Sequence, residues 1–182
     1  MHGYNDIISL ENLCSAWQEF LPGKKSRKDV ADFSLSLHHN LFRLHEELEN
    51  RSYTHGKYKA FNISDPKPRN IHKAQVRDRV LHHAIYRVLY PYFDRKFIYA
   101  SFSCRNDKGM HRGLDYFERC ARRVSLNNTR TCWALKCDLR KFFATIDQDS
   151  LLRIVAKHIP DWNTLWLLER VIRSFEAAPG KG

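Results

Sequence analysis

An apolar stripe with helical spacing constrains the first third of the chain. Its side chains recur at steps of three and four residues, so they fall on one face of a helix. The members of the stripe are Val30, Phe33, Leu37, Leu41, Leu44 and Leu48. The pattern predicts one helix of about five turns. Because such a stripe normally packs into a core or against a partner, we assign it no chemical role.

The rest of the chain alternates irregularly between helical and extended patterns. A short helix is predicted over residues 9–20, with Ser9 as its N-cap, and a basic loop, PGKKSRK, follows it. Residues 57–63 and 70–72 are typical of two strands, joined by a turn through DPKPR. Further helices are predicted over 76–90, 111–123, 149–158 and 162–175, and a buried strand over 132–138. This mixture predicts an α+β fold.

The helix predicted to begin at Val76 should end before Pro91, because a proline restricts the residue that precedes it. The loop that precedes the predicted strand contains Asn127 and Asn128. Neither an internal repeat nor a low-complexity tract occurs in the sequence.

The charge of the chain indicates a polyanionic partner. Lys and Arg number 31 against 20 Asp and Glu, which gives a formal net charge of +11. Such an excess favours nucleic acid or, less often, an anionic membrane, and a merely basic domain is the alternative. No apolar run approaches the roughly 18 residues that cross a bilayer, and the N-terminal MHGYND is not a signal peptide. We therefore expect no membrane partner and a cytoplasmic location.

The cysteines and histidines give no metal-site pattern. Five cysteines occur without a Cys-x-x-Cys pair, and we expect them to be reduced and mostly to pack in the interior. Cys132 and Cys137 should point to opposite faces of their strand. The adjacent pairs His38-His39 and His82-His83 project about 100° apart on helices, so they cannot easily share a zinc ion.

An acidic residue follows the predicted buried strand in the stretch KCDLRKFFATID. A strand fixes the direction of the Asp138 side chain, and a neighbouring backbone carbonyl can add a second hard oxygen for a divalent cation. The alternative is an aspartate that only ends a strand and caps a turn. On Asp138 alone, both interpretations remain open.

The pattern Asp138-x4-Phe143-x2-Ile146-Asp147 resembles the first palm motif of reverse transcriptases, especially bacterial ones related to group II introns. The resemblance implies that Asp138 and the carbonyl of Leu139 bind catalytic Mg²⁺, of which the complete enzyme uses two ions. It also implies that Phe143 is the steric gate against a ribose 2′-hydroxyl. Asp147 matches the motif too, but we expect it to cap the helix starting near Ser150, and we expect Phe142 in the core.

Two further segments match that family in the same order. PKPRNIHKAQVRDRVLHHAI resembles its fingers segment, and YASFSCRNDKGMHRGL resembles the next segment, in the variant of diversity-generating retroelements. The N-terminal IISLENLCSAWQEF and the basic loop after it also resemble the opening of those enzymes.

The resemblance implies roles for five basic residues, each with a structural alternative. Lys67 and Arg69 would offset charge on the nucleotide triphosphate, unless they belong to a solvated turn. Arg105 would touch the template or stack on a base, unless it is a surface arginine. Arg77 and Arg79 would reach a backbone phosphate, although intramolecular ion pairs are an equal alternative.

The resemblance implies a reverse-transcriptase-like right hand, with a helical N-terminal extension over 1–52, fingers over 53–130 and a truncated first part of the palm over 131–182. No Asp-Asp dipeptide occurs, although the family needs one on a later hairpin. We therefore expect an RNA-directed DNA polymerase in the complete protein and no activity in this fragment alone. Its partners would be an RNA template, a DNA or RNA primer and dNTPs, with an accessory protein or structured RNA as further candidates. The alternative is a non-catalytic RNA-binding module derived from polymerase fingers.

Overall fold

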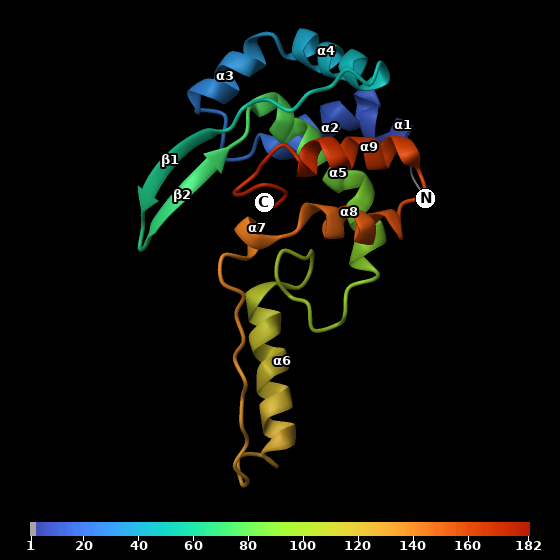
Figure 1. Ribbon diagram of the computed structural model, residues 1–182. Coiled ribbons are helices and arrows are strands. Elements are labelled where there is room, and N and C mark those ends of the chain that lie inside the picture. Colours follow the sequence, from blue (N-terminus) through green and yellow to red (C-terminus); the bar gives the residue numbers. More distant parts are fainter. Residues whose placement is uncertain (1–2) are drawn as a thin grey trace. The chain divides into compact units, whose positions relative to one another are not determined.

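The computed structural model describes residues 3–182, which form nine helices and one two-stranded antiparallel sheet (Figure 1). The helices are α1 (Tyr4–Ile8), α2 (Leu10–Phe20), α3 (Lys28–Leu35), α4 (Leu37–Glu49), α5 (Val76–Asp94), α6 (Gly109–Val124), α7 (Phe142–Thr145), α8 (Gln148–Ala156) and α9 (Trp162–Ile172), and the strands are β1 (Lys59–Ser64) and β2 (Pro68–Lys73). The α+β class is confirmed, and the right-hand arrangement stays a prediction.

The chain divides into two compact units. The first contains the residues up to Leu89 together with Lys141–Gly182, and the second is Tyr90–Arg140. These units do not follow the expected boundaries after residues 52 and 130, because the C-terminal helices pack with the N-terminal ones. The backbone N–H of Tyr4 donates to Asp161 at 2.7 Å, and its ring lies edge-on to Trp166, with the ring centroids 6.3 Å apart.

The core of the first unit is built from apolar faces of several helices. Figure 1 shows α9 beside α1 in this unit. Fully buried side chains come from α1, α2, α4, α5 and α9; examples are Ile7, Leu13, Leu44, Val80 and Leu167. Burial of each such side chain contributes about 1.5–3 kcal/mol. The first turn of α5 belongs to this core through the buried side chain of Val76.

The stripe over residues 30–48 forms two helices, so the prediction of one helix was wrong. Ser36 lies between α3 and α4 with a non-helical backbone (φ −122°, ψ 37°). The Asn40 side-chain amide donates to the carbonyl of Phe33 at 2.9 Å, which satisfies an acceptor at the end of α3. The residues of the stripe are buried or partly buried in both helices, and spacing alone therefore does not reveal the break.

The helix beginning at Val76 does not stop before Pro91, contrary to prediction. α5 continues to Asp94 with Pro91 inside it. Proline removes one backbone donor from a helix but does not forbid it, and only the last turn follows Pro91 here.

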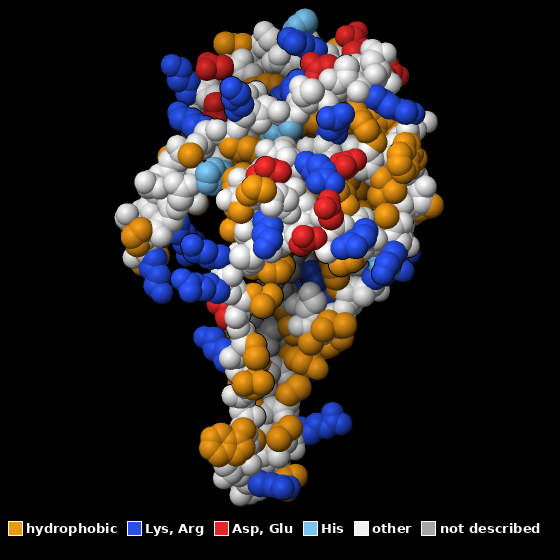
Figure 2. Space-filling view, in the orientation of Figure 1, with side chains coloured by type: hydrophobic (Ala, Val, Ile, Leu, Met, Phe, Trp, Pro, Cys, Tyr) orange, Lys and Arg blue, Asp and Glu red, His pale blue; other side chains and the backbone are white. Residues whose placement is uncertain are grey.

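The second unit contains α6 and irregular segments. The buried strand predicted over 132–138 is wrong, because these residues have no regular secondary structure and their apolar side chains are in solvent. Trp133 is 94% exposed and Leu135 is 90% exposed. A strand needs a neighbour for its backbone donors and acceptors, and the sheet formed within residues 3–182 contains only β1 and β2. Figure 2 shows hydrophobic side chains on the surface of this unit.

Candidate functional site

The β1–β2 hairpin presents two of the predicted site residues to solvent. β1 pairs antiparallel with β2, with Ile63 opposite Arg69 and Ser64 opposite Pro68, so Lys67 lies in the connecting turn. Both basic side chains are exposed. Neither makes a hydrogen bond or ion pair within residues 3–182. The predicted hairpin is confirmed, and its two cations are available to a ligand.

The predicted metal ligands Asp138 and Leu139 lie on an irregular segment of the second unit. Asp138 is exposed and has no hydrogen-bond or ion-pair partner in the described part of the chain. Leu139 is 69% exposed. The carboxylate is therefore accessible, but no strand fixes its direction.

Phe143 belongs to the first unit, on the short helix α7, and is 78% exposed. Its ring centroid lies 5.4 Å from that of Phe142. Phe142 is 48% exposed, so its expected place in the core was wrong. The exposed ring of Phe143 is free to contact a ligand.

Asp147 is the N-cap of α8, as predicted. Its carboxylate accepts a hydrogen bond from the backbone N–H of Ser150 at 2.7 Å. Hydrogen bonds from Ser150 lower the pKa of Asp147. This carboxylate is thus occupied by the helix N-terminus, which agrees with a capping role.

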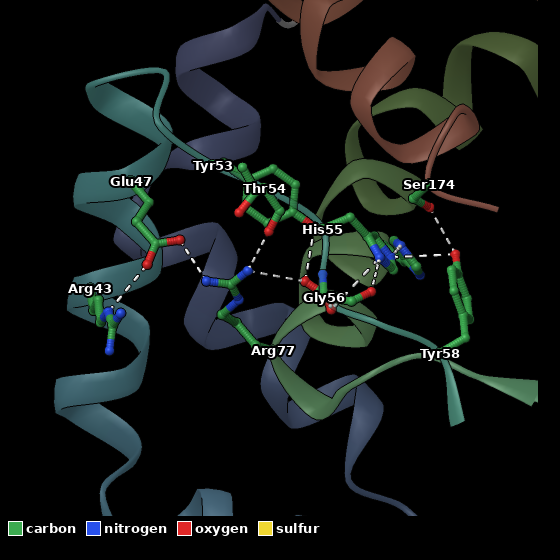
Figure 3. Close-up of polar contacts among 11 residues, drawn as sticks. Arg43, Glu47, Tyr53, Thr54, His55, Gly56, Tyr58, Arg77 and Ser174 are labelled. Carbon is green, nitrogen blue, oxygen red and sulfur yellow. Dashed lines mark hydrogen bonds and ion pairs between the residues drawn. The ribbon is translucent and has the colours of Figure 1, made fainter. Parts of the chain in front are cut away.

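Arg77 is held by intramolecular contacts at the start of α5. Its guanidinium donates to Glu47 and to the carbonyl of Thr54, each at 2.6 Å, and lies over the ring of Tyr53 at 5.2 Å (Figure 3). The side chain is 23% exposed. Of the two alternatives for Arg77, the structure shows the intramolecular ion pair.

Arg79 is held in the same way. It donates to Asp29 at 2.6 Å, and its guanidinium lies 4.9 Å from the ring centre of Phe20. Asp29 also pairs with Lys73 at 2.6 Å. Burial opposes ionisation of Asp29, but the hydrogen bonds and charges of Lys73 and Arg79 outweigh it and lower its pKa.

Arg105 organises a loop of the second unit. It donates to the side chain of Asp94 at 2.7 Å and to the Asp94 carbonyl at 2.8 Å. It also donates to the carbonyls of Ile98 and Ser101, each at 3.3 Å. The hydrogen bond to Asp94 raises the pKa of Arg105. Template contact by Arg105 stays a prediction, and it would require exchange of these bonds.

A buried carboxylate that sequence reasoning missed lies between Arg77 and Arg79 of α5. Asp78 is fully buried and accepts hydrogen bonds from the Tyr53 hydroxyl at 2.9 Å and from the Gly56 N–H at 3.1 Å. Burial, and then the charge of Asp78, raise the pKa of Tyr53. The sequence did indicate this burial, because Asp78 precedes Leu81 by three residues and Ile85 by seven. This spacing places Asp78 on the apolar face of α5.

Two histidines extend this network. His55 Nδ1 lies 2.7 Å from the Gly56 carbonyl, and because a carbonyl oxygen only accepts, Nδ1 donates to it. His55 Nε2 lies 3.2 Å from His82 Nε2. Figure 3 shows the continuation through the Tyr58 hydroxyl, which lies 2.9 Å from the Ser174 hydroxyl. Burial, and next the nearby His55, lower the pKa of His82 to about 4, so the ring is neutral at pH 7.

The described residues do not form a complete metal site. No group of three or more His, Cys, Asp or Glu side chains in residues 3–182 is placed to hold a metal ion. Asp138 and one carbonyl are too few protein ligands to hold Mg²⁺ tightly. By themselves, the described residues could supply only part of the magnesium site that the resemblance implies.

The five cysteines are free, but their predicted packing was wrong. Four are exposed, and only Cys120 is partly covered. Cys132 and Cys137 lie on the irregular segment rather than on a strand. Within residues 3–182, no helix has the length and apolar character needed to cross a membrane.

The chain matches no protein-family model and no curated protein. These comparisons therefore assign no family.

Proposed function

We propose that this chain forms the fingers and the first part of the palm of an RNA-directed DNA polymerase. The proposal rests on three motifs that follow one another in the order of the reverse-transcriptase family. The structure supports it in one respect: the residues that would touch nucleotide or metal are exposed. They are Lys67, Arg69, Asp138 and Phe143.

In this proposal, each exposed residue has one task during nucleotidyl transfer. Lys67 and Arg69 offset negative charge on the triphosphate as the leaving group departs. Phe143 excludes the 2′-hydroxyl of a ribonucleotide by its bulk. Asp138 would supply one carboxylate toward a magnesium ion, which would need further carboxylate ligands from elsewhere in a longer protein.

The test is primer extension by the longer protein to which we propose this chain belongs. With an RNA template, a primer and dNTPs, Asp138→Asn should abolish synthesis, because asparagine keeps the shape of the side chain but loses its charge. Asp147→Asn is the matched control and should keep activity, since asparagine also caps helices well. Normal synthesis by Asp138→Asn, or equal loss in both variants, would contradict the proposal.

A non-catalytic RNA-binding module is the second candidate, favoured by the lack of a metal-ligand cluster in residues 3–182. The same assay separates the two functions. A module of this kind would bind RNA with an affinity that falls steeply as salt rises, because binding releases counterions. It would support no synthesis in the longer protein, whatever residue stands at position 138.

A further inference from the structure

A cavity of about 580 Å³ lies at the base of the hairpin, away from Lys67 and Arg69. Its walls come from the start of α3, the loop before β1, the hairpin base and the first turn of α5. The basic side chains in these walls are Lys28, Lys57, Lys59, Lys73 and Arg77. Cavities of this size are typical of small-ligand sites.

Two of the five cations already have carboxylate partners. Lys73 pairs with Asp29, and Arg77 pairs with Glu47, each at 2.6 Å. Lys28, Lys57 and Lys59 have no ion-pair partner within the described chain. Asp32 is the one carboxylate of the cavity wall left to balance them, besides the paired Asp29. The cavity therefore has an excess of positive charge.

The register of the sheet brings two of these positive charges close together. Lys59 lies directly opposite Lys73 in the β1–β2 pair. Like charges placed opposite each other across two strands destabilise the pair. Asp29 offsets the positive charge of Lys73 only, and Lys57, two residues before Lys59, adds a further positive charge. A bound anion would relieve the remaining repulsion.

The other walls fit a planar ring. Phe33 lines the cavity, and its ring centroid lies 5.3 Å from that of Trp17, which supports it from behind. Gln75 adds an amide, which can both donate and accept hydrogen bonds at the edge of a base. One aromatic platform suits one base, whereas proteins that hold single strands stack successive bases on several.

We propose that this cavity binds a free mononucleotide, with its phosphate on Lys57 and Lys59 and its base on Phe33. The site is separate from the proposed triphosphate contacts of Lys67 and Arg69. It does not depend on the polymerase assignment, because no residue of the cavity takes part in that proposal except Arg77, whose guanidinium is paired within the chain.

The test is titration of the chain with AMP at low salt, followed by NMR or calorimetry. Inorganic phosphate and adenosine serve as the separated halves of the ligand. AMP should bind more tightly than either half. Lys57→Gln/Lys59→Gln should weaken AMP binding by about tenfold or more, because the phosphate would lose both of its charge-assisted hydrogen bonds. Lys25→Gln/Lys157→Gln, which removes the same charge outside the cavity, should change it little.

A second variant tests the ring contact. Phe33→Leu keeps apolar bulk against Trp17 and should lower the affinity for AMP while leaving that for phosphate unchanged. The proposal is overturned if AMP binds no better than phosphate, or if the control double variant weakens binding as much. It is also overturned if a single-stranded RNA of about ten nucleotides binds through Lys57 and Lys59 while AMP does not, since the cavity would then serve a strand.

Discussion

The basic side chains of this chain have two kinds of environment. Several guanidinium groups donate hydrogen bonds to carboxylates, namely those of Arg77, Arg79 and Arg105. In contrast, the ammonium groups of Lys57 and Lys67 are exposed to solvent. The planar guanidinium is weakly hydrated and offers several donors, which suits partly buried pairs, while the ammonium group of lysine is strongly hydrated. Because some of these cations are paired within the chain, the net charge of +11 overstates the number that are free to meet a ligand.

The neutral, buried His82 makes stability depend on pH. Its pKa lies near 4 in the folded chain and near 6.5 when unfolded, so the unfolded state binds more protons between these values. Stability from this residue is complete above about pH 6.5 and is lost as pH falls toward 4. Between pH 7 and pH 5, the wild type should lose about 1–2 kcal/mol more unfolding free energy than His82→Gln. Urea unfolding at the two pH values measures the difference.

His39→Gln is the control for this experiment, because His39 is exposed on α4. It should leave the pH dependence of the wild type unchanged. Identical pH dependence in the wild type and His82→Gln would show that His82 does not titrate below its normal range.

At the scale of the element, two acidic N-caps start the C-terminal helices. Asp147 begins α8 and Asp161 begins α9, each accepting hydrogen bonds from backbone N–H groups of the first turn. Asp161 also accepts from the Thr164 hydroxyl at 2.6 Å and from the backbone of Tyr4 at 2.7 Å. It therefore links α9 to α1 as well as capping its own helix.

Removing the Asp147 cap should destabilise the first unit. Asp147→Ala leaves the first N–H groups of α8 without this acceptor and should lower the free energy of unfolding by about 1 kcal/mol. Asp147→Asn keeps an acceptor and should change it by only a few tenths of a kcal/mol. Urea midpoints of the two variants measure the effect. Equal losses in both would mean that the charge of Asp147, rather than its hydrogen bond, stabilises the chain.

Elements with local signals could be predicted from the sequence. The hairpin over β1 and β2 follows from its turn residues, and the helix starts at Ser9 and Asp147 follow from capping chemistry. Ser9 accepts from the backbone N–H of Asn12 at 3.2 Å, as its position implies. Each of these signals lies within a few residues of the structure it specifies.

Features that depend on distant partners could not be predicted in the same way. Residues 132–138 have the apolar composition of a buried strand, but they lack a neighbouring strand among the described residues. Asp78 looked like one charge among several, and only the fold brings Tyr53 and Gly56 to it. The exposure of Lys67 and Asp138 agrees with a site, but no local pattern determines what they bind.

At the scale of the whole chain, burial differs sharply between the two units. The first unit contains the fully buried apolar side chains of its helices, whereas α6 in the second unit has no buried residue. An apolar stripe on α6 remains exposed, formed by Met110, Leu114, Phe117 and Val124. The local stability of a segment depends on its buried contacts, so the two units should open independently of each other.

Hydrogen exchange should resolve this difference. Amides of α6 should exchange faster than those of α2 and of the Val76–Leu89 part of α5, by on the order of a hundredfold or more, because little burial opposes opening of α6. Measurement by mass spectrometry at several protein concentrations gives the comparison, with α2 as the internal reference. Protection of α6 equal to that of α2 would contradict the expectation. If that protection then disappeared on dilution, the cover of the apolar stripe would be a second copy of the chain.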